Sequence, residues 1–80
     1  MSTPRKLLES MRQNPRDWRI DQVETVARAF GLTVFHRGGS HYILRNAAGR
    51  KISIPAHRPI KPIYIKALVR LIDTGLGDEE

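Results

Sequence analysis

The sequence predicts an α+β domain in which helices cover one face of a three-stranded antiparallel sheet, with the elements in the order α-α-β-β-β-α. Apolar residues recur at helical spacing near both ends of the chain, and β-branched and aromatic residues dominate the segments between them. The chain has 80 residues, enough for one hydrophobic core and too few for two. We therefore expect residues 1–80 to form a single domain.

The first helix is predicted over residues 1–14 as an addition to the N-terminus of the domain. Thr3 suits the N-cap, and Pro4 suits the first helical position, where its missing amide hydrogen costs no hydrogen bond. The pair Asn14-Pro15 ends the helix. Its apolar stripe consists of Leu7, Leu8 and Met11.

A second helix is predicted to follow Asp21, which would be its N-cap in a capping box with Glu24. Gly31 suits the left-handed position that ends this helix. The apolar residues at helical spacing are Val23, Val26, Ala27 and Phe30.

Three strands and a third helix are predicted in the rest of the chain. The strands cover residues 32–37, 40–45 and 50–55, with turns at Gly38-Gly39 and at residues 46–49. A basic loop over residues 56–61 leads to a helix that begins at Pro62 and ends near Gly75. Its apolar face comprises Ile65, Leu68, Val69 and Ile72. Residues 76–80 are expected to form a flexible acidic tail.

The turns suggest how the strands pair. A two-residue turn at Gly38-Gly39 would pair His36 with His41, and a three-residue loop with left-handed Gly49 would pair Tyr42 with Ile54. An even-numbered second loop is the alternative, and it would turn the third strand over. In the favoured register Phe35, Tyr42, Leu44, Ile52 and Ile54 face the core. The other face then carries Val34, His36, His41, Ile43, Arg45, Lys51 and Ser53.

Charge is distributed unevenly along the chain, which has a formal net charge of +6. No Asp or Glu occurs from residue 31 to residue 72, and such a stretch attracts a polyanion. We therefore predict contact with RNA, while a solvated basic face and an acidic protein partner remain alternatives. The candidate RNA contacts are Arg37, Gly39, Ser40, Arg45, Lys51, Arg58, Lys61 and Lys66.

The residue types present restrict the chemistry. The chain has no cysteine and no clustered carboxylates, which argues against thiol catalysis and paired-carboxylate hydrolysis. Its three histidines match no common zinc spacing, so we expect neither a metal nor another cofactor. His41 follows a Gly-Gly-Ser turn, and imidazole transfers protons near neutral pH. His36 and Ser40 are candidate helpers, although a cross-strand histidine pair without chemistry is the simpler interpretation of His36.

The sequence lacks the features of a membrane or exported protein. It has no apolar run of the roughly 18 residues that would span a membrane. Charged and polar residues interrupt the apolar positions at its start, which therefore lacks a signal-peptide core. We expect a cytoplasmic protein without a membrane partner.

Several segments together resemble the HicA toxins, small mRNA interferases of toxin–antitoxin modules. The resemblance covers roughly residues 12–76. Its segments are NPR (14–16), AFGL (29–32), GSHYIL (39–44), ISIP (52–55), IKPIY (60–64) and ALVRLI (67–72). Many family members have a second histidine directly after the motif histidine, whereas this chain has Tyr42 there.

The resemblance implies a double-stranded-RNA-binding-domain-like fold and metal-independent cleavage of mRNA, with His41 as the catalytic residue. It also implies a HicB-like antitoxin that covers the active site. An apolar, acidic antitoxin would find Val34 and Ile43 beside His41 on the predicted free face. The alternatives are an RNA-binding module without catalysis and a basic protein-interaction domain.

Overall fold

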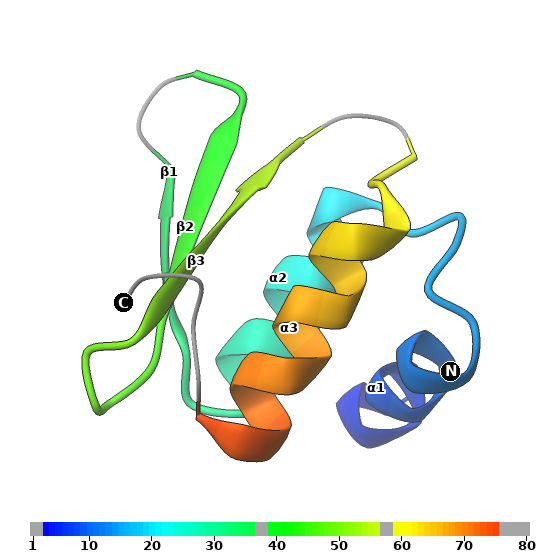
Figure 1. The fold of residues 1–80 in the computed structure, drawn as a ribbon, viewed down its shortest axis with the longest axis horizontal. Coiled ribbons are helices and arrows are strands. Elements are labelled where there is room, and N and C mark those ends of the chain that lie inside the picture. The colour runs from blue at the N-terminus through cyan, green and yellow to red at the C-terminus, as the bar shows by residue number, and fades with distance from the viewer. Residues whose placement is uncertain (1–2, 37–38, 57–58, 76–80) are drawn as a thin grey trace.

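A computed structural model describes residues 3–36, 39–56 and 59–75, and it confirms the predicted order of elements (Figure 1). Three strands form one antiparallel sheet in the order β1-β2-β3. Within the described ranges no helix is long and apolar enough to cross a membrane. The elements are α1 (Pro4–Gln13), α2 (Ile20–Ala29), β1 (Thr33–His36), β2 (His41–Arg45), β3 (Lys51–Pro55) and α3 (Pro62–Thr74).

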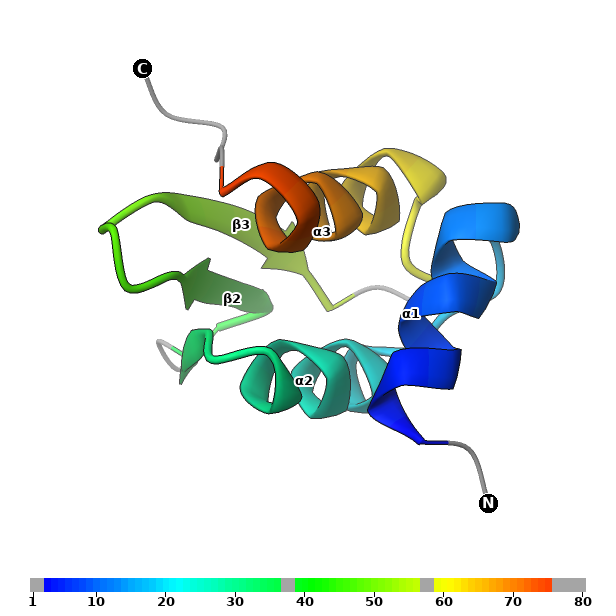
Figure 2. The same ribbon diagram turned by 90° about the horizontal axis from the view of Figure 1, so that it is seen from below.

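The elements form three layers. Figure 2 shows α2 and α3 side by side on one face of the sheet, with α1 on their far side. Contacts between elements agree with this view, because α2 and α3 contact strands and α1 contacts the two helices. The opposite face of the sheet is left uncovered by the described helices. The core between the layers comprises Leu8, Met11, Trp18, Val23, Val26, Ala27, Leu32, Leu44, Ile52, Ile54, Ile60, Ile65, Leu68 and Leu71.

Helix α1 has the predicted ends. Thr3 is its N-cap, and the Thr3 hydroxyl accepts a hydrogen bond from the Lys6 amide at 3.3 Å. Asn14 is the C-cap, directly before Pro15. Leu8 and Met11 are buried, so the apolar stripe docks α1 onto the other helices.

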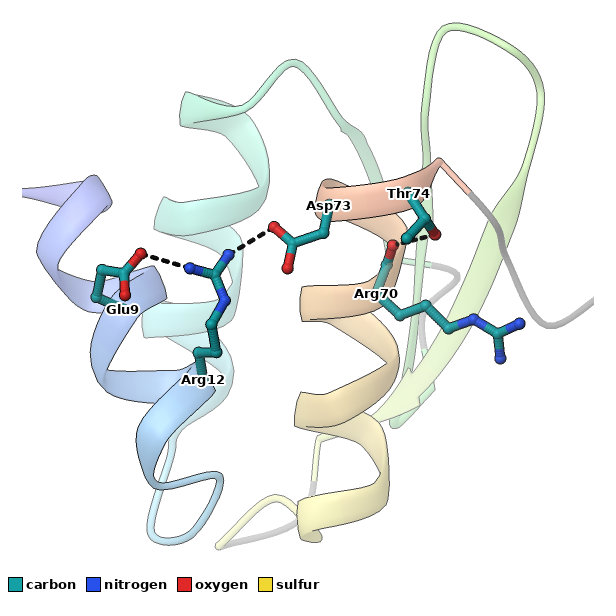
Figure 3. Close-up of polar contacts among 5 residues, drawn as sticks. All are labelled: Glu9, Arg12, Arg70, Asp73 and Thr74. Carbon is teal, nitrogen blue, oxygen red and sulfur yellow. Dashed lines mark hydrogen bonds and ion pairs between the residues drawn. The ribbon is translucent and has the colours of Figure 1, made fainter.

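An ion-pair network joins α1 to the last turn of α3 (Figure 3). The Arg12 guanidinium pairs with Glu9 on its own helix and donates to Asp73 Oδ1 at 2.5 Å. Desolvation lowers the pKa of Arg12, but the contacts with Asp73 and Glu9 raise it more, so the pKa lies above its ordinary value. The three side chains are exposed, and such pairs contribute little stability. The network therefore orients α1 more than it stabilises the fold.

The predicted capping box of the second helix is wrong. Helix α2 begins at Ile20, and the Gln22 side chain accepts a hydrogen bond from the amide of the N-cap, Arg19, at 3.0 Å. Asp21 lies within the first turn, where its charge suits the helix dipole. The cause is tertiary, because a bridge between Trp18 and Ile60 holds the backbone extended directly before Arg19.

The end of α2 is as predicted. Gly31 has a φ of 83°, which only glycine adopts without strain. The Gly31 amide donates to Arg28 O at 3.2 Å, and the Leu32 amide donates to Ala27 O at 2.8 Å. These two bonds form a Schellman motif, and the buried Leu32 turns the chain toward the sheet.

The second hairpin also confirms its prediction. Tyr42 pairs with Ile54 and Leu44 with Ile52. Gly49 has a φ of 86°, and the Asn46 amide donates to Arg50 O at 2.9 Å, which closes a loop of three residues. The Asn46 side chain donates to Gly75 O at 3.1 Å and so ties this loop to the end of α3.

The register predicted for the first hairpin is wrong by one residue. His36 pairs with Tyr42 instead of His41, and Phe35 pairs with Ile43. A shift of one residue exchanges the faces of a strand. Val34 and His36 therefore face the helices, and Phe35 faces outward. Val34 packs against the core, and the His36 ring stacks on Tyr42 with centroids 4.2 Å apart.

Helix α3 starts at Pro62 as predicted and ends before Gly75, whose φ is 76°. Ile65, Leu68 and Leu71 are its buried residues. Val69 and Ile72 from the predicted face are only partly buried. The predicted acidic tail, residues 76–80, lies outside the described residues.

Candidate functional site

The sheet face opposite the helices, here called the free face, carries the candidate site. Strand residues alternate between faces, and residues paired across strands share one face. Leu44 is buried under the helices, so Ile43 and its neighbours on alternate positions point away from them. The free face thus comprises Thr33, Phe35, His41, Ile43, Arg45, Lys51, Ser53 and Pro55.

The chemistry of the free face changes along β2. His41 lies at one end, Ile43 in the middle and Arg45 at the other end. Lys51 is paired with Arg45, so two cationic residues lie side by side there. No carboxylate belongs to the sheet, because residues 31–72 contain no Asp or Glu. The charged residues that the strands place on this face are therefore all basic, which favours an anionic ligand.

His41 is the first residue of β2, and its side chain is exposed. The backbone around it is held in the ladder, since His41 pairs with Pro55 and Ser40 O accepts the Ala56 amide at 2.5 Å. The imidazole is thus presented to solvent from a defined backbone position. A histidine placed in this way can accept or donate a proton on a bound ligand.

His36 is separated from His41 by the sheet. The predicted pairing of the two histidines is wrong, because His36 lies on the helix-facing side and stacks on Tyr42 with an interplanar angle of 3°. The His36 Nε2 atom also lies 2.5 Å from Gly39 O. His36 thus contacts Gly39 and Tyr42 on the face opposite His41.

Phe35 occupies the free-face position that the sequence predicts for Val34. Phe35 is 46% exposed and pairs with the half-buried Ile43, so the two form an apolar centre on this face. The Arg45 Cζ atom lies 5.8 Å from the centre of the Phe35 ring. The alternation of strand residues predicts which face Phe35 occupies only when the register between the first two strands is known.

Val34 is not available as a contact on this face. It is half-buried on the helix side, where it packs against the core. The prediction that Val34 lies beside Ile43 and His41 on the free face is therefore wrong. His41 and Ile43 themselves lie two residues apart on one strand and share that face.

The remaining predicted contacts are dispersed. Gly39 and Ser40 are exposed beside His41. Lys61 is the N-cap of α3 and lines a pocket of about 370 Å³ with Arg16 and Pro59. Lys66 lines a different pocket, of about 170 Å³, together with Met11 of α1. Helix α1 itself lies on the far side of α2 and α3 from the sheet (Figure 2). Arg37 and Arg58 lie outside the described residues.

Comparison with known proteins gives no information on the role of the site residues. No family model, no curated protein and no solved structure matches this chain. Within residues 3–36, 39–56 and 59–75, no group of three or more His, Asp or Glu residues could hold a metal ion. The candidate site is thus defined by its own geometry: an exposed imidazole, an apolar centre and a cationic end on one open face.

Proposed function

We propose that this protein is the toxin of a type II toxin–antitoxin system and cleaves mRNA as a metal-independent endoribonuclease. The observation that carries the proposal is the exposed imidazole of His41 on a sheet face that no described helix covers and whose own residues include no carboxylate. The proposal includes a fold of the double-stranded-RNA-binding-domain type. Its support is the succession of α2, the three strands and α3, with both helices on one face.

The proposed reaction uses the His41 imidazole of the free face, a water molecule and polar groups next to His41 in the chain. His41 accepts the proton of a ribose 2′-hydroxyl, whose oxygen then bonds to the adjacent phosphorus. The bond from phosphorus to the 5′-oxygen breaks, and that oxygen takes a proton from water. Ser40 and the Gly39 amide lie next to His41 in the chain, and in this proposal they bind the phosphate oxygens.

Arg45 and Lys51 serve substrate binding at a distance from the reacting bond. A strand rises about 3.4 Å per residue, so Arg45 lies roughly 14 Å along β2 from His41. At that distance neither residue neutralises charge at the reacting phosphorus. They instead attract phosphates further along the same RNA strand.

Neutralisation by a HicB-like antitoxin is the second part of the proposal. A protein that covers the free face would contact His41 and Ile43 together and would block access to the imidazole. Positive charge at Arg45 and the apolar character of Ile43 suit a partner that is acidic and partly apolar.

Two other functions fit the same face. An RNA-binding module would use its charge without any proton transfer at His41. A basic protein-interaction domain would use it for an acidic protein. Both differ from the proposed ribonuclease in one respect, because neither requires the imidazole.

The test compares wild-type protein with His41→Ala, both by induction in cells and by cleavage of purified RNA in the presence of EDTA. Loss of a general acid–base group lowers cleavage by roughly 10²–10⁴-fold, and growth should recover accordingly. Thr33→Ala, an exposed free-face position without a proposed role, is the matched control and should cleave like wild type. Growth arrest with intact mRNA from both wild type and His41→Ala would instead support an RNA-binding module.

A further inference from the structure

We propose that Phe35, assisted by Arg45, is a base-stacking residue that holds a nucleotide of single-stranded RNA next to the phosphodiester whose cleavage His41 promotes. This inference rests on the proposed ribonuclease function and adds a substrate class and a positioning residue to it. It arises from the register of the first hairpin, which places Phe35 on the free face.

The position of Phe35 relative to His41 is set by the strand pairing. Phe35 is paired with Ile43, and His41 lies two residues before Ile43 on the same face. Such diagonal neighbours in an antiparallel sheet are roughly 7–8 Å apart. A base stacked on Phe35 would therefore belong to a nucleotide directly beside the one whose phosphate lies at His41.

The exposure of Phe35 is what makes it a binding residue. Leaving the apolar surface of an aromatic ring in water is unfavourable in free energy compared with burying it in the core. Phe35 is nevertheless 46% exposed, in the middle of a cationic face. The other large exposed apolar side chains, Phe30 at 39% and Ile63 at 67%, lie outside the sheet. Among the described residues, Phe35 is thus the exposed large aromatic side chain on the free face.

Arg45 adds charge at the same place. Its guanidinium carbon lies 5.8 Å from the Phe35 ring centre, within the range of a cation–π contact. With Arg45 at that distance the Phe35 residue is still 46% exposed, which leaves area for a base to stack on it. The Arg45 charge is then beside the phosphate of the stacked nucleotide. Aromatic rings combined with cations are the usual platform for single-stranded nucleic acids.

The same features select single-stranded RNA as the ligand. In a duplex the bases are stacked on one another and cannot reach an aromatic side chain on a flat sheet face. An unpaired strand offers both base faces and phosphates, and it meets no repelling carboxylate within residues 31–72. The cleaved RNA segments are therefore expected to be unpaired.

The experiment measures binding separately from cleavage. In a His41→Ala background, the affinity of the parent for a short unstructured RNA is compared with the affinities of Phe35→Trp, Phe35→Leu and Phe35→Ala. Loss of one stacked base weakens binding roughly five- to a hundredfold. We expect that loss for the Ala and Leu variants alike, and affinity equal to the parent for the Trp variant. A base stacked at position 35 should also quench the tryptophan fluorescence of Phe35→Trp. The native Trp18 is buried, so its own fluorescence should not change on binding.

Matched controls use a second phenylalanine and a modified ligand. Phe30→Ala removes an exposed ring of the same type outside the sheet and should bind like the parent. An abasic nucleotide moved along the RNA should weaken binding at one position, and that effect should disappear in Phe35→Ala. Thermal melting checks that each variant is folded.

Three results would overturn the inference. Unchanged RNA affinity of Phe35→Ala would show that RNA does not use the Phe35 side chain. Full RNA affinity of Phe35→Leu would show that an apolar side chain is enough and that the ring does not stack on a base. Equal affinity for duplex and unpaired RNA would contradict the substrate class. In each case cleavage by wild type and its loss in His41→Ala would still stand, so the proposed function is tested independently. Absence of both binding and cleavage would instead refute the function.

Discussion

The two faces of the sheet are built from the same strands but differ in burial and in charge. On β2, Leu44 is fully buried under the helices, whereas its neighbour Ile43 is half-buried on the free face. The helix-facing side thus supplies hydrophobic stabilisation. The free face holds the exposed His41 and Phe35, together with positive charge and no carboxylate from the sheet itself. Alternation along a strand lets one segment of chain place core residues and residues of the proposed binding face at adjacent positions.

The largest expected effect separates the faces by stability. Leu44→Ala deletes a fully buried side chain and should lower the free energy of unfolding by about 2–5 kcal/mol. Ile43→Ala, one residue earlier on the same strand, should cost about 1 kcal/mol or less, because Ile43 is only half-buried. Urea denaturation of the two variants measures both values. Equal losses would mean that the free face is covered as well as the helix side.

A smaller effect is expected at His36, which tests whether chemistry is confined to the free face. His36→Ala removes the stack on Tyr42 and should cost about 1 kcal/mol of stability. His36→Phe keeps an aromatic ring at that position but cannot transfer a proton. Because His36 lies on the face opposite His41, we expect RNA cleavage by His36→Phe to match that of wild type. A large loss of cleavage in His36→Phe, with the protein folded, would show that His36 takes part in the reaction.

The smallest expected effect concerns two cations that the fold places on different sides. Arg45→Gln should reduce the dependence of RNA affinity on salt, lowering the log–log slope by about 0.7, as for one phosphate contact with a single strand. Lys66→Gln removes the same charge from α3, on the side facing α1, and should leave the slope unchanged. Titrations at several salt concentrations measure both slopes. Equal changes of the slope in both variants would indicate that RNA is attracted by the overall positive charge of the protein and not by contacts on the free face.

Features that depend on local backbone chemistry could be predicted from the amino-acid sequence. Thr3 and Pro4 start α1, and Gly31 and Gly75 end α2 and α3, because caps and left-handed positions suit few residue types. Gly49 determined the three-residue loop and with it the register of the second hairpin. His41 was also placed on the free face by the sequence pattern, since its side of β2 follows from that hairpin.

Tertiary structure alone decided the features for which the local sequence is ambiguous. The strand Thr33–His36 offers one apolar side chain to each face, Val34 to one and Phe35 to the other, and glycine in the turn permits more than one loop length. Val34 packs against the core and His36 stacks on Tyr42, and these contacts select the register. The bridge between Trp18 and Ile60 likewise accompanies the earlier start of α2. Phe35 therefore lies on the free face because the contacts of its neighbours Val34 and His36 select the register, whereas a turn motif constrains only its own residues.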